Sequence, residues 1–98
     1  MPHKSPICWN GFVFVHTQSD DLADHYTGDG APGRLTHSRT HNIWMACLRE
    51  AKAYCHGGRE YSDDKAAARA ALDAALEVLR RRVAADRDWI KHVEREIG

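Results

Sequence analysis

The periods of hydrophobic and polar residues change along the chain, and the N-terminal segment has the pattern of a β-hairpin. Aromatic and β-branched residues on both sides flank the pair Asn10-Gly11. A two-residue type I′ turn needs positive φ at both central positions, and Asn-Gly meets this need at low cost. We therefore predict strands at about residues 5–9 and 12–16, joined as an N-terminal β-hairpin.

Residues 17–39 are polar and rich in aspartate, glycine and proline, as in the stretch from Gly28 to Gly33. Clusters of these residue types are typical of loops. The stretch 34–37 has a weak strand pattern. The sequence therefore predicts a long His- and Asp-rich loop over residues 17–39.

The C-terminal part of the chain has the 3.6-residue period of α-helices. A first helix is expected at about 41–56, after the N-cap Thr40 and before Gly57-Gly58, which would end it. A second helix is expected at 62–97, with Ser62 as its N-cap and an alanine-rich first half of high helix propensity. The predicted fold is one α+β domain, residues 1–98, dominated by a helical hairpin over 40–98.

Apolar residues in the second predicted helix alternate by four and three positions, as in a coiled coil, and Asp86 interrupts them. This helix would be about 50 Å long and the first about 25 Å, so the first helix is too short to cover the apolar seam. We predict a homodimer, or binding to another protein, through the long helix. Its predicted interface consists of Leu79, Val83, Trp89, Ile90, Val93 and Ile97.

Two alternatives for this helix stay open. The N-terminal hairpin could cover part of the seam of the continuous helix. Alternatively, Asp86 could kink the helix or cap a new one at Arg87, giving three shorter helices that close on themselves. The mixed charges beside the seam are compatible with both parallel and antiparallel pairing.

The net charge of zero argues against a polyanionic partner, such as nucleic acid or an anionic membrane, that would bind through overall charge. Lys and Arg number 14, and Asp and Glu also number 14. A neutral chain has no overall field that would attract nucleic acid or an anionic membrane. A nucleic-acid-binding regulator is nevertheless one alternative, because the long helix is locally basic. The residues concerned are Arg80, Arg81, Arg82, Arg87 and Lys91.

Histidine and aspartate side chains supply the candidate metal ligands and acid–base groups. A metal-dependent hydrolase that uses the predicted loop is the second alternative. The paired spacing of known zinc motifs is absent, so we expect no cofactor and no enzymatic activity. The candidate metal ligands are His16, Asp20, Asp24, His25, His37 and His41.

Three cysteines, Cys8, Cys47 and Cys55, form an odd and widely spaced set, which favours free thiols in a reducing compartment. No stretch has the length and apolar character of a signal peptide core or a membrane span. The sequence therefore predicts a cytoplasmic, non-enzymatic interaction module of the inhibitor, adaptor or regulator type. Its protein partner cannot be identified from the residues.

Overall fold

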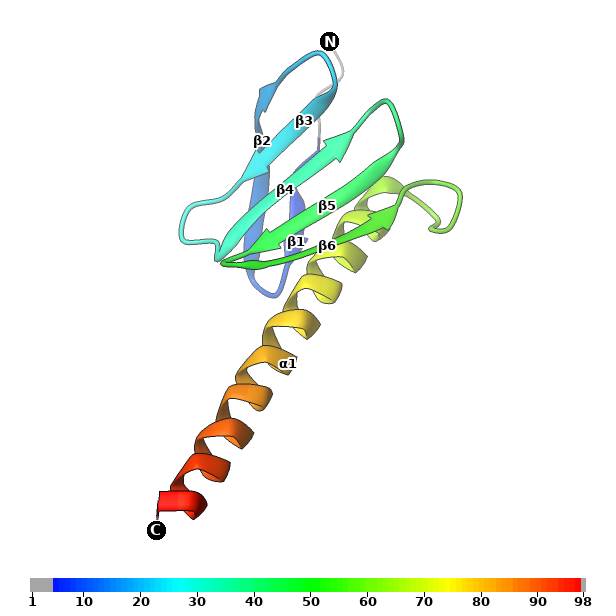
Figure 1. Ribbon diagram of the computed structural model, residues 1–98. Coiled ribbons are helices and arrows are strands. Elements are labelled where there is room, and N and C mark those ends of the chain that lie inside the picture. The colour runs from blue at the N-terminus through cyan, green and yellow to red at the C-terminus, as the bar shows by residue number, and fades with distance from the viewer. Residues whose placement is uncertain (1–4, 98) are drawn as a thin grey trace.

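The computed structural model describes residues 5–97, which form a six-stranded antiparallel sheet and one C-terminal helix (Figure 1). Each strand pairs with the next along the chain, so the order in the sheet is the order in the sequence. The strands are β1 (Ile7–Trp9), β2 (Phe12–Ser19), β3 (Ala23–Thr27), β4 (Gly33–Ser38), β5 (Ile43–Leu48) and β6 (Ala51–His56). The helix is α1 (Asp64–Ile97).

The sheet curls around the first half of α1. The helix contacts β5, β6 and β1, and the last two are the opposite edges of the sheet. The core therefore fills the space between the concave face and the helix. Its largest buried side chains from the sheet are Trp44, Phe14, Leu35 and Leu48.

Small residues allow the helix to approach the sheet closely. On α1 the fully buried positions are Ala67, Ala68, Ala71, Leu72 and Ala75. An alanine-lined helix face brings the helix backbone near the sheet, and the large side chains of the sheet fill the space. Trp9 ties β1 to the helix, since its Nε1 donates to Asp73 Oδ1 at 2.8 Å.

The predicted N-terminal hairpin is confirmed. Cys8 pairs with Val13 across the turn, and Asn10 and Gly11 have φ values of 48° and 82°. Both turn residues are thus left-handed, as a type I′ turn requires. The second strand is longer than expected and continues to Ser19.

The predicted first helix over 41–56 is wrong, because this segment forms the β5–β6 hairpin. Trp44, Ala46 and Leu48 alternate toward the core with Met45 facing out, a two-residue period that also fits the sequence. The turn is built on Arg49 at φ 54°, a residue with no special preference for that conformation. A short apolar stretch can fit both the helix period of 3.6 residues and the strand period of two, and tertiary packing then decides which structure forms.

The predicted loop over 17–39 is also wrong, because it contains the end of β2 and all of β3 and β4. Gly33 allows β4 to lie close to β5, because a Cβ at this position would be 1.8 Å from the backbone oxygen of Cys47. The weak strand pattern of residues 34–37 corresponds to β4, where His37 pairs directly with Asp24 of β3, and both side chains face the concave side of the sheet.

The long C-terminal helix is present, but the helical hairpin and coiled coil predicted for the chain are wrong. The described residues contain one helix, so the fold is dominated by the sheet. The N-cap is Asp63, not Ser62, since Asp63 Oδ1 accepts from Ala66 N at 2.6 Å. The helix runs without a break through Asp86. Within residues 5–97, no helix combines the length and apolar character needed to cross a membrane.

Candidate functional site

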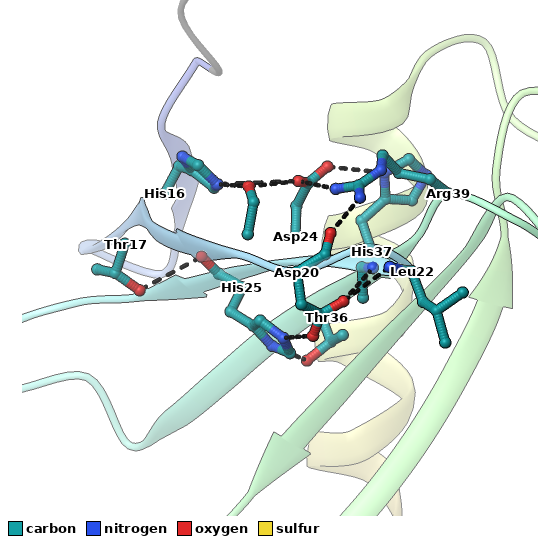
Figure 2. A network of polar contacts seen from close by, with 11 residues as sticks. His16, Thr17, Asp20, Leu22, Asp24, His25, Thr36, His37 and Arg39 are labelled. Carbon is teal, nitrogen blue, oxygen red and sulfur yellow. Dashed lines mark hydrogen bonds and ion pairs between the residues drawn. The ribbon is translucent and has the colours of Figure 1, made fainter.

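Two regions hold the residues that the sequence marks as functional. The first is a polar cluster on β2, β3, β4 and the turns beside them, shown in Figure 2. The second is the half of α1 that extends past the sheet in Figure 1. The polar cluster consists of His16, Ser19, Asp20, Asp24, His25, His37 and Arg39.

Asp24 is the centre of the polar cluster. Its side chain is completely buried, and Arg39 Nη1 pairs with its Oδ1. Ser19 Oγ also donates to Oδ1, at 2.7 Å. Two imidazoles lie farther away: His16 Nε2 is 3.8 Å from Oδ1, and His37 Nδ1 is 4.0 Å from Oδ2. A buried carboxylate needs such pairing because an isolated buried charge is costly.

The contacts of Ser19 determine what chemistry its hydroxyl can perform. The single hydroxyl proton is donated to Asp24. His16 Nε2 lies 2.6 Å from the same oxygen, and the tautomer with its proton on Nε2 can donate to Ser19. An activated serine needs a base that accepts its proton. The hydrogen bonds of Ser19 therefore link β2 to β3 and do not activate a nucleophile.

Asp20 shapes the turn between β2 and β3. Its Oδ1 accepts from the backbone N–H groups of Leu22 and Ala23, and its Oδ2 lies 3.0 Å from His25 Nε2. The hydrogen bond from His25, followed by those two backbone bonds, lowers the pKa of Asp20 to about 2. Thr36 Oγ1 lies 3.4 Å from His25 Nδ1, so His25 can donate through Nε2 and accept through Nδ1.

His37 joins the polar cluster to the aromatic part of the core. Its ring stacks on Trp44 with centroids 4.5 Å apart, and its Nε2 bonds to Asn42 Oδ1 at 2.9 Å. The ring of Tyr26 also contacts Trp44, with centroids 5.3 Å apart. Burial, followed by the charges of Asp24 and Asp64, raises the pKa of Tyr26. A pocket of about 500 Å³ opens here between the start of α1 and the concave face.

The predicted metal ligands are divided among separate contacts. His16 and His37 flank Asp24, His25 pairs with Asp20, and His41 lines a different pocket beside His56. Among the residues that the structure describes, no group of three or more His, Cys, Asp or Glu side chains is arranged to hold a metal ion.

The second half of α1 extends into solvent. Arg82 Nη1 bonds to the backbone oxygen of Glu50, in the β5–β6 turn, at 3.3 Å. All side chains from residue 80 to residue 92 are exposed. The molecule is therefore elongated, with extents of 64 × 29 × 24 Å. We call residues 80–97 the projecting half of α1.

Apolar side chains of the predicted interface lie on the projecting half. Val83, Trp89 and Ile90 are 45%, 65% and 54% exposed, and Val93 is half-buried. Leu79 is half-buried at the point where the sheet ends, and a shallow, mainly apolar groove of about 330 Å³ runs from it past Val83. The side chain of Ile97 lies outside the described residues.

The basic residues proposed for nucleic-acid binding differ in their contacts. Arg81 pairs with Glu77 one turn away at 3.2 Å, and Arg82 bonds to the β5–β6 turn. The exposed side chains of Arg80, Arg87 and Lys91 lie along one stripe of the helix, at spacings of seven and four. The acids Asp86, Asp88 and Glu94 interrupt this basic region.

Sequence reasoning did not identify Ser19 and Arg39, which complete the environment of Asp24. The available signal was alternation: Asp24 and Tyr26, and likewise Leu35 and His37, are two residues apart, as residues on one face of a strand are. The high polarity of this segment concealed that signal, because only a neighbouring strand supplies the partner of a buried charge.

Comparisons with protein-family models, with curated proteins and with solved structures gave no match. The candidate function therefore depends on the geometry of the polar cluster and of the projecting half of α1.

Proposed function

We propose that this protein is a small, non-enzymatic interaction module whose binding surface is the projecting half of α1. Through this surface it pairs with a second copy and presents its sheet domain to another macromolecule. The observation that carries the proposal is the exposure of Val83, Trp89 and Ile90 on a helix that has left the sheet.

Helix energetics support a binding role for the projecting half. Helices of this length are marginal in water unless an apolar face packs against something. The half of α1 next to the sheet has that support in buried Leu72, and the projecting half does not. Pairing would bury Ile90 and Trp89, and large aromatic side chains contribute strongly to binding energy at interfaces.

The polar cluster supports a non-enzymatic role. Asp24 is paired with Arg39, and Ser19 gives its proton to Asp24. His25 is bonded to Asp20 within the turn that both residues stabilise. These hydrogen bonds and ion pairs hold strands β2, β3 and β4 in register. This structural role explains why the side chains of the polar cluster lie together, and it requires no substrate.

The proposal includes a reducing compartment, the cytoplasm. Cys8, Cys47 and Cys55 are all free thiols. Exposed Cys8 in particular would be subject to oxidation outside a reducing environment.

Analytical ultracentrifugation of the purified chain over a range of concentrations tests the proposal. The wild type should associate reversibly, and Ile90→Asp should raise the dissociation constant about a hundredfold, as expected for a central apolar contact. Ala85→Asp, which adds the same charge at an exposed position away from Ile90, is the matched control and should associate like the wild type. A wild-type chain that stays monomeric, or an Ile90→Asp variant that associates normally, would contradict the proposal.

A further inference from the structure

We infer that the outward face of the sheet, the face opposite α1, binds single-stranded nucleic acid along β6. The inference names the partner of the sheet domain and in that respect rests on the proposed function, but it does not require pairing through α1. Three features of this face support it: its charge, two pockets without acidic lining, and an exposed aromatic ring between them.

Strand alternation determines which side chains face outward. On β6, Lys52, Tyr54 and His56 are exposed and alternate with residues that are buried or packed on the core. On β4, exposed Arg34 lies on the same outward face, because its neighbour Leu35 is completely buried on the other. None of the outward residues in the described strands β3–β6 is Asp or Glu. This face is therefore cationic, although the whole chain is neutral.

The first pocket lies across β5. Arg34 and Lys52 pair with the same β5 residue, Cys47, from opposite sides, so their Cα atoms are about 10 Å apart. The two cations line a pocket of about 220 Å³ together with His25 and Thr36. Arginine, lysine and hydroxyl side chains are the groups that most often contact nucleic-acid phosphates. The pocket is therefore suited to a backbone phosphate.

The second pocket lies where β6 ends. It has a volume of about 450 Å³, and its lining includes His41, His56 and exposed Arg59. Among the described residues, no Asp or Glu lines this pocket or the first. Lys52 and His56 are four strand residues apart, which is about 13 Å. Both pockets are thus within reach of one short stretch of a nucleic-acid strand.

Tyr54 lies between the two pockets and provides a stacking surface. Its side chain is 65% exposed, and its ring meets that of His56 edge to face with centroids 6.5 Å apart. Nucleic-acid bases stack on such rings whatever their sequence, while neighbouring cations bind the backbone. An acidic peptide would use the cations but leave the ring without a partner. The combination therefore favours nucleic acid.

Acidic residues at the borders of the face determine the path of the strand. At the β3 side, Asp20 Oδ2 lies 3.0 Å from His25 Nε2, and its charge would repel phosphate. Glu50 precedes β6 and Glu60 follows Arg59. The contact is therefore expected to follow β6 itself, at the edge of the sheet, and to include only a few nucleotides.

Fluorescence anisotropy with a labelled oligothymidylate of about 15 nucleotides tests the inference. The wild type should bind with a dissociation constant of about 10–100 µM at low salt. Three cations, Arg34, Lys52 and Arg59, predict a slope of about −2 for log affinity against log salt, since each phosphate neutralised on a single strand contributes about −0.7. Arg34→Ala/Lys52→Ala should weaken binding about tenfold and reduce the slope to about −0.7.

The stacking role of Tyr54 has its own test. Tyr54→Ala should weaken binding about tenfold, whereas Tyr54→Phe keeps the ring and should bind within about twofold of the wild type. A strand of the same length that lacks bases should bind about tenfold more weakly than oligothymidylate. Equal binding of the two strands would show that the face attracts any polyanion, and it would overturn the inference.

The matched control is Arg80→Ala/Lys91→Ala, which removes two exposed cations from the projecting half of α1. It should bind the oligonucleotide like the wild type. A loss as large as that of Arg34→Ala/Lys52→Ala, or no binding by the wild type, would overturn the inference. Ile90→Asp should bind within about twofold of the wild type, because the site lies within one copy. Self-association without oligonucleotide is measured separately, so the proposed function can fail or stand independently.

Discussion

The two halves of α1 are continuous in sequence and geometry but differ in the size of the side chains that face the sheet side. In the first half these side chains are mostly alanines and are fully buried, as at Ala68 and Ala71. In the projecting half they are larger and exposed, as at Ile90 and Trp89. Small residues occur where the helix backbone approaches a sheet with large side chains, and large residues occur where nothing else within the described chain supplies bulk.

The largest expected difference between the halves is in the cost of removing an apolar side chain. Leu72→Ala should lower the free energy of unfolding by about 3 kcal/mol, because Leu72 is fully buried and its removal leaves a cavity. Ile90→Ala should change it by less than about 0.5 kcal/mol in dilute monomer, because Ile90 is 54% exposed. Urea unfolding followed by circular dichroism measures both values. Equal losses would mean that the projecting half packs on the sheet.

Adding bulk should distinguish the halves in the opposite direction. Ala68→Leu should destabilise the protein by about 2 kcal/mol, because the helix face beside the sheet has no room for extra carbon atoms. Ala84→Leu, at an exposed position of the projecting half, is the matched control and should leave stability unchanged. Thermal unfolding of both variants checks the result. A neutral Ala68→Leu would show that the core is loosely packed.

Trp9, which bonds to the first half of α1, and Trp89, on the projecting half, should differ in how much replacement by phenylalanine lowers stability. Trp9→Phe removes the hydrogen bond to Asp73 and should cost about 1 kcal/mol of unfolding free energy. Trp89→Phe keeps an exposed aromatic ring and should have no measurable effect on monomer stability. Urea midpoints of the two variants provide the measurement. An undiminished midpoint for Trp9→Phe would mean that the bond adds no net stability.

The smallest expected effect is a pH dependence at the sheet, with the projecting half as reference. The pKa of Asp20 is lowered from 3.8 to about 2, so its ionised form stabilises the fold above pH 4, and this contribution is lost as the pH falls toward 2. The stability difference between wild type and Asp20→Asn should therefore shrink over that range. Asp88→Asn removes one charge from the projecting half and should show a smaller change, measured by urea unfolding at each pH.

The long C-terminal helix could be predicted from the sequence, and most of the sheet could not. The four-and-three spacing correctly indicated an apolar line on a long helix, because helix periodicity is a local property. The polar cluster was predicted as loop chemistry, because the pairing of Asp24 with Arg39 depends on residues 15 positions apart that only strand pairing brings together. The helix prediction over 41–56 was wrong for the same reason, because the pairing of β5 with β4 and β6 cannot be inferred from the local pattern.

The sequence by itself determined the Asn10-Gly11 turn and the presence of a long C-terminal helix, while the structure decided that this helix is continuous through Asp86 and capped by Asp63. The turn and the helix follow from local preferences: two residues that tolerate positive φ, and an alanine-rich segment of high helix propensity. The tertiary structure alone decided that residues 43–56 are strands and that polar β3 and β4 join the sheet. The hydrogen bonds of a strand are made to another segment, so its stability depends on neighbours that no local pattern specifies.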